Sequence, residues 1–222
     1  MKRSSMVVLV ILAIFSSMAL ADMVTFGANN NQPKSSQFEG RTKIAGTPDS
    51  APFMGVLPFA ISIVPPAQLP LSDWDVFGAR LNIFVGEHRN VAFVDGGVLG
   101  NIVNGNLMGV QLAGIYNEVG SSCGAIQVAG FFNHIKHDFC GLQLSLINRV
   151  DGDMQGLQAG LVNLTQDGAG LQFGVFNRAE RFSGLQFGVA NYAYQLQGMQ
   201  IGVFNVIEDS NVPFMPVINA AF

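Results

Sequence analysis

The sequence has few charged residues and no run of basic ones. Only 12% of its 222 residues are charged, and the formal net charge is −4. Proteins that bind nucleic acid carry a basic patch or stripe that contacts the phosphates. Since this chain has no such stripe, we expect no nucleic-acid partner.

The chain also lacks an apolar run long enough for a confident transmembrane helix. The apolar run at residues 6–15 is too short to span a bilayer. It follows Lys2 and Arg3 and precedes an Ala-Leu-Ala sequence at 19–21, which is the layout of a secretory signal peptide. No cysteine follows the cleavage site, which argues against a lipid-anchored N-terminus. We therefore expect residues 1–21 to be a signal peptide and the mature protein to be exported, either soluble outside the cytoplasm or inserted into a membrane as β-structure.

Proline is absent between Pro70 and Pro213, although the chain contains nine. Proline cannot donate a hydrogen bond to a β-ladder, so it is confined to the edges of sheets. The restriction of proline to the two ends of this stretch is typical of a stack of strands whose outermost edges are blocked. The proline-free stretch is therefore open to continuous strand pairing.

Three segments follow from the composition along the chain. Residues 1–21 are the signal peptide, and residues 22–51 are polar and rich in turn-forming residues, which predicts a flexible leader. Residues 52–222 are predicted to form a single β-repeat domain, with the repeats clearest over 109–219.

The dominant feature of the chain is a repeated octapeptide, Gly-Φ-Gln-Φ-Gly-Φ-x-Asn, where Φ is apolar. Copies occupy residues 141–148, 156–163, 170–177, 184–191 and 198–205. Weaker copies extend the series to about ten units at spacings of 14–16 residues, with Arg80, Asp95 and Phe214 at the glutamine position of degenerate copies. The glutamines are Gln111, Gln127, Gln143, Gln158, Gln172, Gln186 and Gln200, and the asparagines are Asn117, Asn133, Asn148, Asn163, Asn177, Asn191, Asn205 and Asn219.

Within each unit the residue types alternate with a period of two. Leu185 and Phe187 share one face of an extended segment, and Gly184 and Gln186 share the other. A helix would scatter the apolar residues, and each glycine would cost it about 1 kcal/mol relative to alanine. The units are therefore predicted to be strands, and the fold to be all-β.

Two architectures fit tandem strand repeats of 14–16 residues. We favour a parallel β-solenoid, in which each unit forms one coil, identical residues stack and the apolar face points inward, because stacking in register selects identical repeats. The alternative is a closed antiparallel β-barrel of outer-membrane type with about ten strands, in which the apolar face meets lipid and the Gly/Gln face lines the lumen. The terminal Phe222 resembles the insertion signal of bacterial outer-membrane barrels.

The two rows of amide residues have a structural interpretation. Side-chain amides that stack on their own copies form ladders of hydrogen bonds, so we interpret the glutamine row as a structural ladder rather than a flat recognition surface. Asparagine tolerates left-handed backbone and bonds its own neighbours, so the asparagine row is interpreted as stabilising turns.

One cluster contains residue types that bind metals. His134, His137 and Cys140 are weak candidate ligands, but their spacing matches no standard zinc site. We therefore expect no metal and no other cofactor.

The two cysteines suggest a disulfide. Cys123 and Cys140 lie one unit apart, each just before a glycine, and the protein is expected to be exported. Stacked coils would bring them within bridging distance, whereas consecutive antiparallel strands would hold them at opposite rims.

The tandem Gly-Leu-Gln-x-Gly-Φ-x-Asn units, with residues 76–82 before them and 213–219 after them, resemble the bacterial surface repeat-containing proteins. The resemblance covers about residues 59–222 and implies export and exposure on or in the cell envelope. It assigns no catalytic residue, and we find no Ser/His/Asp set, paired carboxylates or nucleotide fingerprint in the sequence. We therefore expect a non-enzymatic structural or interaction scaffold with an envelope or surface partner. The alternative is an outer-membrane barrel serving as a small pore or anchor.

Overall fold

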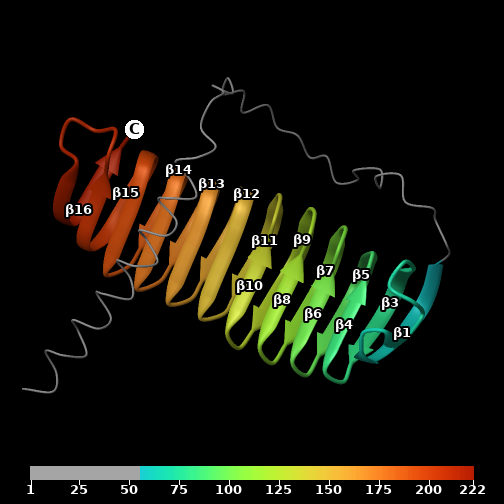
Figure 1. Ribbon diagram of the computed structural model, residues 1–222. Coiled ribbons are helices and arrows are strands. Elements are labelled where there is room, and N and C mark those ends of the chain that lie inside the picture. Colours follow the sequence, from blue (N-terminus) through green and yellow to red (C-terminus); the bar gives the residue numbers. More distant parts are fainter. Residues whose placement is uncertain (1–55) are drawn as a thin grey trace, which may run out of the picture. The chain divides into compact units, whose positions relative to one another are not determined.

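The computed structural model describes residues 56–222, which form stacked β-coils without a helix (Figure 1). The described residues belong to one compact unit. The expected signal peptide at 1–21 and the flexible leader at 22–51 lie outside the described residues. No helix within residues 56–222 is long and apolar enough to cross a membrane.

Each coil of the first half has a long strand on one side and a short strand on the other. The long strands are β3 (Asp75–Asn82), β5 (Asn90–Gly97), β7 (Leu107–Ala113), β9 (Cys123–Ala129) and β11 (Phe139–Leu144). The short strands are β4 (Val85–His88), β6 (Gly100–Val103), β8 (Tyr116–Val119) and β10 (Phe132–Ile135). We call these two sides of the solenoid the long side and the short side.

In the second half, one strand runs through both sides of a coil, short side first. These strands are β12 (Ile147–Ala159), β13 (Val162–Phe173), β14 (Phe176–Phe187) and β15 (Ala190–Ile207). The coil period falls to 14 residues here, as the steps from Gln158 to Gln172 and Gln186 show. The connection between the short side and the long side is shorter here, and β13, β14 and β15 pair with one another on both sides of the coil.

Neighbouring coils pair in parallel, and like residues lie opposite like. Gln143 pairs with Gln127 on one side and Gln158 on the other, and the parallel pairing continues from β1 (Val56–Val64) through β15. The predicted parallel β-solenoid is therefore confirmed, and the closed antiparallel barrel is wrong. The degenerate copies at Arg80 and Asp95 also lie in register with Gln111.

The prediction that Phe214 occupies the glutamine position of a last repeat is wrong. Strand β16 (Phe214–Ala221) turns back and pairs antiparallel with β15, so Asn219 and not Phe214 lies opposite Gln200. The segment at residues 213–219 therefore ends the solenoid instead of adding a coil, because a returning strand covers the edge that a further coil would need.

The N-terminal end is closed in a similar way. Strand β2 (Ala67–Leu69) pairs antiparallel with β1. The side chain of Gln68 then reaches the edge of β4, where its Nε2 donates to the Glu87 carbonyl at 2.6 Å and its Oε1 accepts from the Glu87 amide at 3.2 Å. The Gln68 side-chain amide therefore bonds the backbone of β4 at the edge where a preceding short-side strand would pair.

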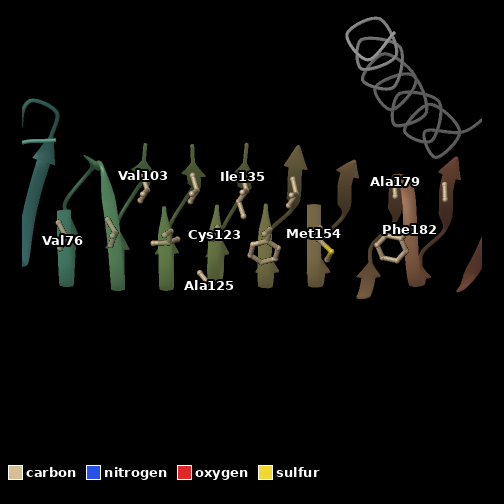
Figure 2. Close-up of a cluster of buried hydrophobic side chains, with 14 of the residues drawn as sticks. Val76, Val103, Cys123, Ala125, Ile135, Met154, Ala179 and Phe182 are labelled. Carbon is tan, nitrogen blue, oxygen red and sulfur yellow. The ribbon is translucent and has the colours of Figure 1, made fainter. Parts of the chain in front are cut away.

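The hydrophobic core consists mainly of two rows of side chains that lie outside the octapeptide (Figure 2), and Ala125, at a glycine position of one copy, joins them. One row lies four residues before each glutamine position and the other two residues after each asparagine position. The first row is Val76, Val91, Leu107, Cys123, Phe139, Met154, Phe182 and Leu196, and the second includes Val103, Val119, Ile135, Val150, Ala179, Ala193 and Ile207. These are the weaker apolar positions between the octapeptides.

The prediction that the strongly apolar residues point inward is wrong. The glutamines are completely buried, so their neighbours along each strand must point outward. Leu112, Ile126 and Phe173 are accordingly 46%, 45% and 41% exposed. The interior therefore holds amides and a modest apolar core, and the strongest apolar pattern of the sequence lies on the surface.

Candidate functional site

Two ladders of buried amides run through the interior of the solenoid. From Gln127 onward, each glutamine of the row donates from Nε2 to the Oε1 of the glutamine one coil earlier, as Gln172 does to Gln158 at 2.8 Å. Up to Asn191, each asparagine of the row donates from Nδ2 to the Oδ1 of the asparagine one coil later, as Asn163 does to Asn177 at 2.8 Å. The same amide of Asn163 also donates to the Phe173 carbonyl at 2.8 Å, which fastens the turn. Asn205 ends this ladder, and the predicted member Asn219 donates instead to the Asn205 carbonyl. Because both rows are buried, neither can serve as a recognition surface.

The glutamine ladder ends on a buried ion pair near the N-terminal end. Gln111 Nε2 donates to Asp95 Oδ2 at 2.8 Å, and Arg80 Nε donates to Asp95 Oδ1 at 2.6 Å. A carboxylate accepts hydrogen bonds without donating, so Asp95 can receive bonds from both sides. His88 completes the group, with its Nδ1 3.0 Å from Arg80 Nη1. All of these side chains are buried, so the cluster closes the ladder and offers no contact to a substrate.

The position of His88 has an electrostatic consequence. Burial and the neighbouring Arg80 guanidinium lower the pKa of His88 to about 4. The neutral ring accepts the Arg80 hydrogen bond at Nδ1. The folded protein therefore holds this histidine uncharged at neutral pH.

The three candidate metal ligands do not converge. His134 Nε2 lies 2.8 Å from Asp151 Oδ2, whereas His137 and Cys140 are exposed. Burial alone would raise the pKa of Asp151, but hydrogen bonds from His134 and Arg149 outweigh it and lower that pKa. Within residues 56–222 no three His, Cys, Asp or Glu side chains are placed to hold a metal ion.

The predicted disulfide is not formed, and both cysteines are free. The reason is a register difference of one residue: Cys123 lies opposite Phe139, and Cys140 lies opposite Gly124. Adjacent positions on a strand point to opposite faces, so Cys123 is buried and Cys140 is exposed. Burial also raises the pKa of the Cys123 thiol. Counting from the glutamine marker would have revealed the offset, since Cys123 precedes Gln127 by four residues and Cys140 precedes Gln143 by three.

The apolar rows that were predicted to point inward form an apolar surface of the molecule. Three rows of apolar side chains point outward along the long side and around the turn that follows it, and we call them the apolar face. The rows are Val110, Ile126, Leu142, Leu157, Leu171, Leu185 and Met199 before each glutamine; Leu112, Val128, Leu144, Ala159, Phe173, Phe187 and Ile201 after it; and Ile115, Phe131, Leu146, Leu161, Val175 and Val189 in the turn. Exposed Phe59, Leu81 and Val94 continue it toward the N-terminal end.

From residue 107 to residue 209, charged residues are confined to the opposite edge. Between residues 107 and 209, every charged residue lies one to five places after a repeat asparagine, on the short side or in the turn that follows it, and we call this region the charged edge. Its members are Glu118, Lys136, Asp138, Arg149, Asp151, Asp153, Asp167, Arg178, Glu180, Arg181, Glu208 and Asp209. Several pair with one another across coils, as Lys136 does with Glu118 at 2.6 Å. The solenoid is therefore amphipathic across its width.

Comparison of the chain with protein-family models, curated proteins and solved structures found no match. The apolar face and the charged edge are therefore the features of the molecule that point to a function.

Proposed function

We propose that this protein is a non-enzymatic, exported scaffold of the bacterial cell envelope that binds its partner through the apolar face. The observation that carries the proposal is the outward position of three continuous apolar rows, with Ile126, Leu161 and Phe173 each at least 41% exposed. The resemblance to bacterial surface repeat-containing proteins supports the envelope location. A barrel pore is not proposed, because the strands form an open parallel stack.

The size of the apolar face supports a binding role. About ten coils at ~4.8 Å spacing, with an apolar width of about four residues at ~3.3 Å, give a flat footprint of roughly 600 Å². The largest apolar patch on a typical soluble monomer covers about 300–600 Å² and is often functional. A face at the upper end of this range is more than scattered surface hydrophobicity would produce.

The scaffold is suited to hold such a face flat. Parallel strand pairing joins successive coils, and the two amide ladders pair the same coils a second time inside. A partner therefore meets rows of side chains held at a constant spacing, and little conformational entropy is lost when they are covered.

Fractionation of cells that export the protein would test this proposal. The double variant L157E/L185E places two carboxylates on the apolar face, two coils apart so that they do not lie directly opposite each other. We expect wild-type protein in the envelope fraction and this variant in the released soluble fraction, because a buried charge without a partner is strongly unfavourable.

The matched control is L164E/Y194E, which adds the same charge on the other surface of the solenoid. Leu164 lies in register between Arg149 and Arg178, and Tyr194 is exposed at the charged edge. The control variant should stay with the envelope, and circular dichroism should show both variants folded. Equal retention of wild type and L157E/L185E in the envelope would contradict the proposal.

A further inference from the structure

We propose that the partner of the apolar face is the hydrocarbon of a lipid surface, with the solenoid lying on it by its apolar face and turn. This inference rests on the proposed function, since it names the partner of the same face. Figure 1 shows the coils stacked side by side from β3 to β15, so the turns of successive coils form one continuous ridge.

The backbone of that ridge has no need of water. The Leu161 amide donates to the Leu146 carbonyl at 2.8 Å, the Val175 amide to the Leu161 carbonyl at 2.9 Å, and the Val189 amide to the Val175 carbonyl at 3.0 Å. Unpaired backbone groups are what exclude ordinary loops from lipid, where each costs several kcal/mol. Turns whose backbone groups bond from coil to coil remove that obstacle.

The distribution of charge sets the orientation. A strand of seven residues spans about 23 Å, and the charged edge lies at the opposite end of that span from the ridge. Interfacial proteins bury their apolar side about 5–10 Å deep. When the solenoid is tilted so that the ridge and the long side both face the surface, insertion to that depth covers the ridge and the two adjoining rows while Lys136, Asp153 and Glu180 stay in water.

The shape of the apolar face favours lipid over a second copy of this chain. Two sheets pack through their flat faces at about 10 Å separation. Here the apolar rows continue around the turn, where Phe131, Leu161 and Val189 are 53%, 50% and 47% exposed. A face-to-face dimer would leave this ridge in water, whereas a fluid hydrocarbon surface can cover both the flat rows and the ridge.

The chemistry of the face also specifies the kind of lipid contact. No basic residue lies on the apolar face, and the net charge of the chain is −4, so anionic head groups give no attraction. Binding should therefore depend on apolar burial alone. We expect equal binding to zwitterionic and anionic vesicles and little change with salt.

Flotation of the purified protein with phosphatidylcholine vesicles tests the inference. Wild-type protein and L164E/Y194E should float with the vesicles at both 0.05 M and 0.5 M salt, values chosen to span about 14 Å to 4 Å of Debye screening. L157E/L185E should bind at least about tenfold more weakly, because two leucines lose their burial.

Three results would overturn the inference. Wild-type protein that forms a dimer abolished by L157E/L185E would identify a second copy of this chain as the partner. Binding that requires anionic lipid and disappears at high salt would identify head-group charge as the cause. If L157E/L185E leaves the envelope fraction in cells while wild type ignores these vesicles, the proposed function stands and the lipid inference fails.

Discussion

A glutamine in the middle of this chain is held in place by copies of itself. Gln172 donates to Gln158 and accepts from Gln186, so its side chain contributes to two coils besides its own. The presence of glutamine at the same place in successive units predicts such a ladder. A row that must pair with its own copy requires one residue type, whereas the outward row beside it admits Val, Ile, Leu and Met.

Replacing Gln172 by leucine should destabilise the protein by about 2–5 kcal/mol. The change leaves the Gln186 donor and the Gln158 acceptor buried without partners, and each unsatisfied group costs about 1–3 kcal/mol. Urea unfolding monitored by circular dichroism measures the difference. Gln155→Leu, at an exposed position, is the control and should change stability little. Equal stability of the two variants would argue against the ladder as a source of stability.

His88 should make folding stability depend on pH. The unfolded histidine has a pKa of 6.5 and the folded one of about 4. Well above pH 6.5 the His88 side chain is neutral in both the folded and the unfolded state, so it does not lower the folding stability. As the pH falls from 6.5 to 4, the unfolded chain takes up a proton that the folded chain does not, so stability falls, by up to about 3 kcal/mol.

The variant His88→Gln isolates this effect. Its amide oxygen can still accept from Arg80, but the side chain does not titrate. The free energy of unfolding in urea, measured between pH 7 and pH 4, should fall less steeply for the variant. The same slope in both proteins would show that another group causes the dependence.

At the scale of the strand, period-two alternation predicts strands and their register but not which side is buried. The side chains Leu185 and Phe187 are more apolar than Gly184 and Gln186, so hydrophobicity taken one unit at a time points the wrong way. The deciding contacts are amide pairs between residues 14–16 places apart, and a single unit does not contain them. The disulfide prediction was wrong for a related reason. It aligned Cys123 and Cys140 on the glycine that follows each of them, whereas the register between coils is given by the glutamine ladder.

Gly188, in the turn after β14, and Gly124, on β9, should respond differently to the same substitution. A Cβ on Gly188 would lie 2.7 Å from Asn177 Nδ2 and 2.7 Å from the Gly174 carbonyl oxygen, inside the asparagine ladder. A Cβ on Gly124 would meet nothing within 4 Å. Gly188→Val should therefore lower the melting temperature by about 5–10 °C through overpacking, and Gly124→Val should leave it nearly unchanged.

Differential scanning calorimetry of the two variants would decide the matter. Equal melting temperatures would mean that the glycines beside the ladder are not closely packed. A loss confined to Gly124→Val would reverse the assignment of inner and outer surfaces.

At the scale of the whole molecule, the repeat determines the architecture, while the segments outside it determine where the stack ends. Antiparallel strands β2 and β16 cover the first and last coils, and the prolines at 65, 66, 213 and 216 lie in or beside these strands. Proline positions indicated blocked edges. They did not indicate a reversal of strand direction, because reversal at Pro213 depends on pairing with β15 and has no local signature.

The opposite donor directions of the two ladders affect how long such a molecule can be. A row of aligned amides adds its dipoles, and one row alone would accumulate partial charge at its ends as coils are added. Here the glutamine dipoles and the asparagine dipoles oppose each other in the coils that carry both residues. Duplication or deletion of a 14-residue unit should therefore change the length of the solenoid without building up a macroscopic dipole.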